Sequence, residues 1–239
     1  MSVVVPFCRP QFSPHYFWAH VSETAVQEQL RRAFGRWGLP RGLRVDNGSP
    51  WGSWSDLPTA LAMWLIGLGI AMVWNPPRQP QKNGVVERSQ GTAKRWAEPH
   101  TCASTAELQQ RLDADDRLQR EQYPLVKDKS RWELFPQLAH ADRPYRARDE
   151  KKSWDLERVR QHLVGYAVTR KVDCTGQVSL YNRNYYVGVV HAGKTVYVMF
   201  DPQRSEWLFA DADGKQLRSQ PAVEITAERI CSLQLKGKK

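Results

Sequence analysis

The sequence has few of the residues that mark disulfide-rich or zinc-binding proteins. Its 239 residues include four cysteines, at positions 8, 102, 174 and 231, and no two of them form a CxxC pair. This spacing argues against a disulfide scaffold, so reduced thiols are expected. The six histidines are scattered and no cysteine pair accompanies them, so a zinc site is not expected.

Long apolar segments are also missing. The longest uninterrupted apolar run, residues 60–74, has fifteen residues and includes Gly67 and Gly69. A membrane-spanning helix needs about 20 residues, so this run is too short. The N-terminal MSVVVPF has no basic residue ahead of it and no clear cleavage site follows, which argues against a secretory signal. We therefore expect a cytoplasmic protein with no membrane partner.

Positive charge is what the sequence has in excess. Its 35 Lys and Arg residues outnumber 25 Asp and Glu residues, which gives a formal net charge of +10. Residues 1–99 carry +5, residues 100–160 carry +1 and residues 161–239 carry +4. A basic surface attracts polyanions, and nucleic acid is a common partner of such proteins. Many basic proteins bind nothing specific, so charge alone makes DNA only a candidate.

Hydrophobic periodicity predicts an α/β arrangement for residues 1–99. Residues 22–37 have helical spacing, with a Thr24 and Gln27 capping box and a stop at Gly38. The remaining expected elements are a strand at 41–46, a helix at 57–66, a strand at 70–74 and a helix at 85–97.

The rest of the chain divides into two patterns. Residues 100–160 are polar and mostly helical in pattern, and we interpret them as a helical connector. From residue 164 the apolar period changes to two, and five short strands separated by turns predict a small β-barrel within residues 161–239. The last residues, 235–239, read as a basic tail.

Two carboxylates stand where a metal site could form. Asp46 ends the strand predicted at 41–46, before Asn47-Gly48, and Glu87 lies in the first turn of the helix predicted at 85–97. Mg²⁺ and Mn²⁺ prefer such oxygen ligands and keep open positions for phosphate. Both residues also have ordinary explanations, because Asp-Asn-Gly is a common turn and a helix N-terminus favours Glu. Taken alone, they are weak support for a metal.

The sequence segments around Asp46 and Glu87 resemble those of a known family. The phrases RVDNGSPWGS and VWNPPRQPQKNGVVERSQGTAKRW are similar to the integrase core of the DDE-type transposase and retroviral-integrase superfamily, specifically of bacterial insertion-sequence transposases. There the second catalytic Asp ends a strand before Asn-Gly, and the catalytic Glu opens a helix within N-G-x-V-E-R. Asp46 and Glu87 occupy these positions. The resemblance implies a partial ribonuclease-H-like core at 1–99 and the β-barrel that follows it in Mu-type transposases.

The resemblance also implies partners and a cofactor. Asp46 and Glu87 would hold Mg²⁺ or Mn²⁺ for transposition and DNA integration, and a DNA-bound protein would associate with the nucleoid. Lys94 resembles the basic residue that holds DNA ends, although a solvated helix face explains it equally well. Arg88 and Arg95 are candidates for phosphate contacts or ordinary surface residues. A homo-oligomer, or a hetero-oligomer with full-length transposase, is expected.

The chain departs from the family in its first catalytic residue. The family's first Asp lies upstream of the helix that corresponds to residues 22–37, but this chain has no Asp or Glu before Glu23. We therefore expect the downstream part of a transposase, through truncation, a displaced start codon or decay, with negligible strand transfer alone. The alternative is a non-catalytic DNA-binding or assembly protein that joins or inhibits a full-length transposase. Forty residues separate Asp46 from Glu87, a few more than is usual in the family.

Other residues are assigned less sharply. Arg170, Lys171, Arg183 and Lys194 are expected to form a basic edge of the barrel, on charge alone. A further group, the tryptophans, is expected to serve packing rather than base stacking. Its members are Trp51, Trp54, Trp64, Trp74 and Trp96.

Overall fold

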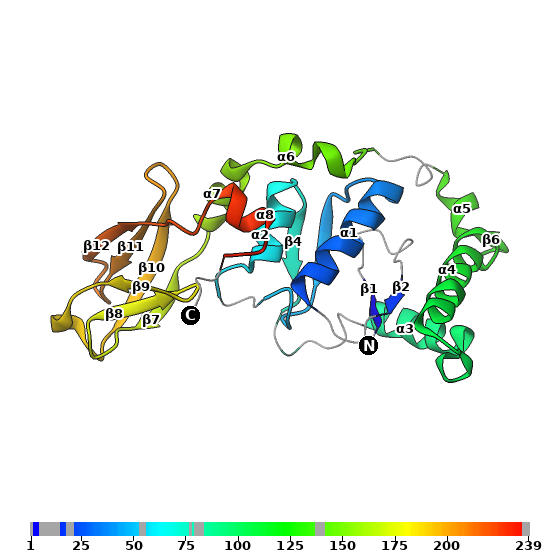
Figure 1. Cartoon of the computed structure of the whole chain (residues 1–239), viewed down its shortest axis with the longest axis horizontal. Helices are drawn as coiled ribbons and strands as arrows, with labels where there is room; N and C mark the ends of the chain where they lie inside the picture. The colour runs from blue at the N-terminus through cyan, green and yellow to red at the C-terminus, as the bar shows by residue number, and fades with distance from the viewer. Residues whose placement is uncertain are drawn as a thin grey trace. The chain divides into compact units, whose positions relative to one another are not determined.

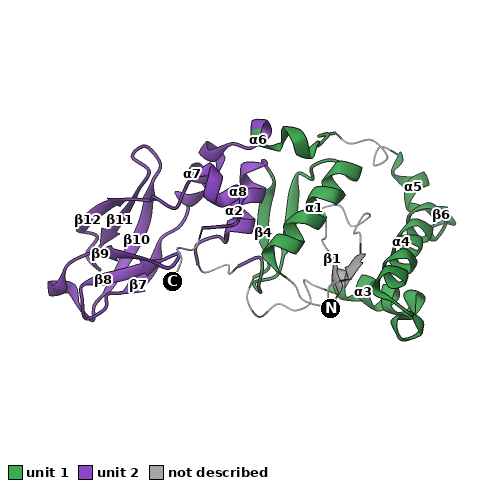
Figure 2. Cartoon of the chain, in the orientation of Figure 1, with its two compact units in different colours: residues 1–50, 70–151 green, residues 51–69, 152–239 purple. Residues whose placement is uncertain are grey.

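The computed structural model forms two compact units, each discontinuous in sequence (Figures 1 and 2). It describes residues 22–52, 56–76, 78, 84–136 and 142–235, except the side chains of residues 85, 86 and 125, and the backbone of residues 2–4 and 15–17. The first unit comprises residues 1–50 and 70–151, and the second comprises residues 51–69 and 152–239. None of the helices formed by the described residues is long and apolar enough to cross a membrane.

The first unit combines helices with small two-stranded sheets. Its elements are β1 (Ser2–Val4), β2 (His15–Phe17), α1 (Glu23–Trp37), β3 (Gly42–Val45), β4 (Ala71–Trp74), α3 (Gly84–Ala97), the short helix η2 (Pro99–Thr101), α4 (Thr105–Glu121), β5 (Pro124–Val126), β6 (Lys129–Ser130), α5 (Arg131–Leu134) and η4 (Ala147–Asp149). β3 and β4 pair in parallel, whereas β1 pairs antiparallel with β2, and β5 with β6. The mixed α/β class is confirmed, and the described strands of this unit form no larger sheet.

Helix α1 is held at both ends by local contacts. The Ser22 side chain accepts a hydrogen bond from Ala25 N at 3.1 Å, so Ser22 caps the helix rather than the predicted Thr24. At the other end Gly38 has φ 78°, and its N–H donates to Phe34 O at 2.7 Å. Glycine adopts this left-handed conformation at little cost, which confirms the predicted stop.

A buried carboxylate joins distant parts of the first unit. The Arg31 guanidinium donates to both Glu150 oxygens, at 2.9 and 2.7 Å, and the Tyr145 hydroxyl donates to the same carboxylate. Burial and the adjacent Glu150 charge raise the pKa of the Tyr145 hydroxyl well above its ordinary value. Because a buried charge needs both a counterion and hydrogen bonds, this network fixes residues 145–150 against α1.

The second unit combines a four-stranded antiparallel sheet with three helices. The sheet has the order β12-β11-β10-β7, and β8 and β9 form a separate hairpin. A further helix, α6 (Glu150–Ser153), crosses from the first unit into the second. The other elements are α2 (Ala60–Gly67), α7 (Leu156–Leu163), β7 (Val168–Lys171), β8 (Gln177–Leu180), β9 (Arg183–Tyr186), η5 (Val189–His191), β10 (Thr195–Asp201), β11 (Glu206–Ala210), β12 (Gln216–Pro221) and α8 (Ala227–Cys231).

The expected β-barrel is not closed. Among residues 161–235, β8 and β9 pair only with each other. The Gly176 carbonyl accepts the N–H groups of Val187 and Gly188, at 2.8 and 3.0 Å, which continues the pairing of this hairpin past Gln177 and Tyr186. The hairpin meets the β12 edge of the sheet through side chains of β12 rather than through a backbone ladder, because Gln220 Nε2 donates to Tyr186 O at 2.7 Å and the Arg218 guanidinium lies 5.8 Å from the centroid of the Tyr186 ring. The basic tail predicted at 235–239 lies almost wholly outside the described residues.

The core of the second unit surrounds α2. All eight residues of α2 are buried, and the helix packs on α7 and α8. Trp154 Nε1 donates to Trp64 O at 3.0 Å, and its indole lies directly over Gly67. In the sheet, Trp207 and Phe209 are fully buried. The fifteen-residue apolar run therefore forms a core helix and the buried positions of β4.

Candidate nucleic-acid interface

Helix α3 exposes several charged side chains to solvent. Its inner face is made of small residues, because Ala93 and Ala97 are buried against Leu108 and Leu112 of α4. Four charged side chains are exposed elsewhere on the helix, namely Glu87, Arg88, Lys94 and Arg95. The predicted helix at 85–97 is confirmed, with Glu87 in its first turn. At helical spacing Glu87 lies in line with Lys94 and Arg88 in line with Arg95, so the charges form two neighbouring stripes about 100° apart around the helix.

Asp46 stands at the carboxyl end of the parallel strands β3 and β4. It directly follows β3, is exposed, and accepts a hydrogen bond from Gly48 N at 3.1 Å. Asn47 Nδ2 donates to Asn75 O at 2.7 Å, which ties the ends of the two strands together. Ligands of α/β proteins commonly bind where parallel strands end at their carboxyl side. Asp46 is therefore positioned on an edge suited to binding.

The donor chemistry of Asp46 and Glu87 fits a hard divalent cation. Each carboxylate is exposed and offers oxygen ligands, as Mg²⁺ and Mn²⁺ require. Within the part of the chain that the structure describes, no group of three or more His, Cys, Asp or Glu side chains is arranged to hold a metal ion. The two residues fit as part of a ligand set, and a third carboxylate is not supplied by the described residues.

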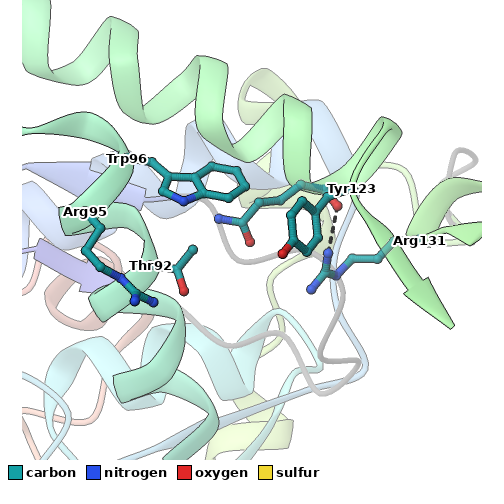
Figure 3. Close-up of a pocket in the computed structure, with 6 residues that line it drawn as sticks. Thr92, Arg95, Trp96, Tyr123 and Arg131 are labelled. Carbon is teal, nitrogen blue, oxygen red and sulfur yellow. Dashed lines mark hydrogen bonds between the residues drawn. The ribbon is translucent and has the colours of Figure 1, made fainter. Parts of the chain in front are cut away.

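A pocket of about 370 Å³ opens beside the C-terminal half of α3 (Figure 3). Trp96 and Tyr123 meet edge to face there, with ring centroids 5.4 Å apart. Arg131 Nη1 donates to Gln119 O at 2.7 Å, and this bond holds the guanidinium at the pocket. The lining residues are Thr92, Arg95, Trp96, Gln119, Tyr123 and Arg131.

Among the tryptophans expected to serve packing, Trp96 differs from the other described ones in its burial. Trp51, Trp64 and Trp74 are buried as expected, but Trp96 is 38% exposed. Trp54 lies outside the described residues. The sequence contains one signal that could have found the exception, because Trp96 follows the cations Lys94 and Arg95 and, at helical spacing, lies at the border of the stripe that contains Ala93 and Ala97.

The basic residues expected on the barrel edge differ in their surroundings. Arg170 Nη2 forms an ion pair with Asp56 Oδ1 at 2.5 Å, so this side chain serves the fold of the second unit. Lys171 and Lys194 are exposed, and Arg183 is partly buried. The first unit therefore holds the denser row of exposed cations, on α3.

Comparison with known proteins gives a distant likeness. No protein family matches the chain. It is similar to a solved structure of the simian T-cell lymphotropic virus intasome in complex with the PP2A regulatory subunit B56 gamma, with a TM-score of 0.41 and 17% sequence identity. The match covers 87% of this chain and 64% of that chain, so this chain spans less than two thirds of its length. A likeness at this level establishes neither a family nor an activity.

Proposed function

We propose that the chain is a DNA-binding protein related to DDE transposases and integrases. The observation that carries the proposal is the position of Glu87, in the first turn of α3 and within the phrase NGVVER, with exposed cations farther along the helix. Arg88, Lys94 and Arg95 contact DNA phosphates, because exposed cations of a helix bind the backbone without reading its sequence.

Asp46 and Glu87 act as two of three metal-ligating carboxylates. Asp46 is supported by its place at the carboxyl end of a parallel strand pair and Glu87 by its place at a helix start. Bound Mg²⁺ or Mn²⁺ would supply activation of a water or a 3′-hydroxyl for phosphoryl transfer. The protein's own part is to present the two carboxylates and to hold the DNA phosphates on α3.

The 239-residue chain is catalytically incomplete by itself. It contains no Asp or Glu before Glu23, so the family's first carboxylate has no counterpart. Losing a ligand that supports the transition state removes several kcal/mol, and each ~1.4 kcal/mol is tenfold in rate. The same observation favours a second candidate function, a non-catalytic protein that binds DNA and joins or inhibits assemblies of a full-length transposase.

The DNA-binding part is tested by titrating a labelled duplex at several salt concentrations. The affinity is expected to fall with salt, with a log-log slope of about −0.9 for each neutralised phosphate. Replacing Arg88, Lys94 and Arg95 by Gln should reduce this slope by up to about three. The control replaces three exposed cations elsewhere in the first unit, Arg117, Lys127 and Lys129, by Gln and removes the same charge. Equal losses in both triple variants would contradict an interface on α3.

The catalytic part is tested by cleavage of a labelled duplex with Mg²⁺, Mn²⁺ or EDTA. We expect no metal-dependent cleavage by the 239-residue chain. A protein extended by an upstream segment that supplies the third carboxylate should cleave, and Asp46→Asn or Glu87→Gln in that protein should abolish cleavage with DNA binding retained. Activity that survives both substitutions would remove these residues from the site.

A further inference from the structure

The pocket beside α3 combines two exposed aromatic rings with two cations. Trp96 and Tyr123 are 38% and 49% exposed, although large aromatic side chains are usually covered. Their edge-to-face contact holds the two ring planes 62° apart, and both residues line the pocket (Figure 3). Fixed, exposed aromatic rings are the platforms on which unstacked bases bind.

The cations of the pocket have no counterions within the described residues. Neither Arg95 nor Arg131 forms an ion pair with a carboxylate among the residues that the structure describes. Partial burial lowers the pKa of the Arg131 guanidinium, but an arginine stays charged at neutral pH. A partly desolvated cation without a counterion is unfavourable, so an anionic ligand would be stabilised there.

We propose that this pocket binds one unpaired nucleotide of a DNA end. The base stacks on Trp96 with the Tyr123 ring at its edge, and its phosphate lies against Arg95 and Arg131. The volume of about 370 Å³ suits a small ligand rather than a stretch of duplex. This inference rests on the proposed function and goes beyond it, because it assigns a site for a single-stranded nucleotide beside the phosphate-binding surface.

The position of the pocket on α3 supports a nucleotide over an acidic peptide. Thr92 and Trp96 follow Glu87 by five and nine residues, which is about 8 and 14 Å along a helix axis. Arg88, Thr92 and Arg95 follow one another at helical spacing and form a track toward the pocket. A DNA strand held near Glu87 could therefore follow this track and place a frayed nucleotide in the pocket. An acidic peptide would use the cations but would leave the aromatic rings without a stacking partner.

The test uses the full 239-residue chain and two duplexes of the same sequence. One duplex is blunt, and the other carries a short single-stranded 3′ extension with 2-aminopurine, whose fluorescence is quenched when it stacks. Binding of both is measured by anisotropy at one salt concentration. Trp96→Ala should weaken binding of the extended duplex by about five- to one-hundred-fold and relieve the quenching, because stacking contributes about 1–3 kcal/mol per base. Binding of the blunt duplex should stay unchanged, since no charge is removed.

Two further variants control for folding and for charge. Trp96→Phe keeps an aromatic ring and should restore most of the affinity for the extended duplex. Arg131→Gln should weaken the extended duplex more than the blunt one, whereas Arg117→Gln, an exposed arginine of α4 outside the pocket, should affect both equally. Circular dichroism should be the same for all variants.

The outcomes separate this inference from the proposed function. If the wild-type chain binds neither duplex, both are overturned. If it binds the blunt duplex with the expected salt dependence but Trp96→Ala weakens both duplexes equally, or neither, only the pocket assignment fails. Binding of poly-glutamate that is lost in Arg131→Gln, with the extended duplex unaffected by Trp96→Ala, would assign the pocket to an acidic protein segment and overturn the nucleotide.

Discussion

Helices α2 and α3 are consecutive α-helices in the sequence, but their side chains differ in burial and charge. Every residue of α2 is buried, whereas α3 exposes four charged side chains, a glycine and a tryptophan. A helix that is apolar all round belongs in a core, and one with a narrow buried stripe belongs on a surface. The difference shows which part of this chain maintains the fold and which part is available to a ligand.

The two units also contain carboxylates that differ in burial, Glu224 in the second unit and Glu87 in the first. In the second unit Glu224 is fully buried and accepts hydrogen bonds from the Tyr185 hydroxyl and from Trp207 Nε1, the latter at 2.8 Å. Burial and the neighbouring Glu224 carboxylate raise the pKa of the Tyr185 hydroxyl well above its ordinary value, so it stays a donor. Glu87 of α3 is exposed instead. The carboxylate of Glu224 is part of the buried hydrogen-bond network of the fold, whereas that of Glu87 is exposed to solvent.

Replacing each carboxylate by Ala should give the largest contrast in stability. Glu224→Ala leaves the buried Tyr185 hydroxyl and Trp207 N–H without their acceptor, and we expect a loss of about 2–4 kcal/mol. Glu87→Ala should change the free energy of unfolding by less than about 0.5 kcal/mol. Urea unfolding of the full chain, followed by tryptophan fluorescence, measures both. Equal effects would show that burial does not separate the two carboxylates.

Two helical glycines sharpen the comparison of α2 with α3. A Cβ at Gly67 of α2 would lie 2.2 Å from the Trp154 indole, whereas a Cβ at Gly91 of α3 would meet nothing within 4 Å. Gly67→Ala should therefore destabilise by about 1–3 kcal/mol through overpacking. Gly91→Ala should stabilise by about 0.5–1 kcal/mol, because Ala favours the helix. Thermal unfolding should show shifts of opposite sign, and two shifts of the same sign would contradict the packing described for α2.

Arg170 and Arg88 should differ in the same way, one affecting stability and the other DNA binding, but their expected effects on free energy are smaller. Arg170→Gln removes the ion pair with Asp56 and should cost about 0.5–1 kcal/mol, with little change in DNA affinity. Arg88→Gln should leave stability unchanged and reduce the salt slope of DNA binding by about one. Unfolding and DNA titration of both variants form a crossed test. Loss of DNA binding in Arg170→Gln alone would move the interface to the second unit.

The periodicity of apolar residues predicted α2, α3 and the elements next to them in the sequence. The helices at 22–37, 57–66 and 85–97 and the strands at 41–46 and 70–74 are confirmed to within a few residues. Each is determined by apolar spacing and by a local stop such as Gly38, so no distant contact was needed. The mixed α/β class follows from the same pattern.

The missed features depend on distant contacts or on polar strands. β12 was not predicted, because QLRSQP is polar and ends in a proline, yet it pairs with β11 at the sheet edge. The β5–β6 hairpin lies within the segment interpreted as a helical connector. The predicted barrel is not closed because β12 meets β9 through the Gln220 side chain rather than through a backbone ladder, a difference that strand patterns do not reveal.

The candidate site was predicted in part for a similar reason. Asp46 and Glu87 lie at the predicted strand end and helix start, since both positions are local. The pocket could not be predicted, because it requires α3 to meet Gln119 in the last turn of α4, Tyr123 just after α4 and Arg131 of α5. Likewise, sequence order does not reveal that residues 51–69 join residues 152–239 in one unit.

The smallest expected effect concerns a histidine in the second unit. His162 of α7, which packs on α2, is partly buried, and burial lowers the pKa of its imidazole below the ordinary 6.5. The folded state therefore favours the neutral ring, so its contribution to stability is complete above pH 6.5 and is lost as the pH falls through the lowered pKa. In that window stability should fall by no more than about 1.4 kcal/mol per pH unit. Urea unfolding between pH 7.5 and 5 should show a shallower dependence in His162→Gln than in the wild type, whereas His100→Gln, at an exposed position after α3, should behave like the wild type. An unchanged pH dependence in His162→Gln would mean that burial of this ring does not contribute to the acid sensitivity of the second unit.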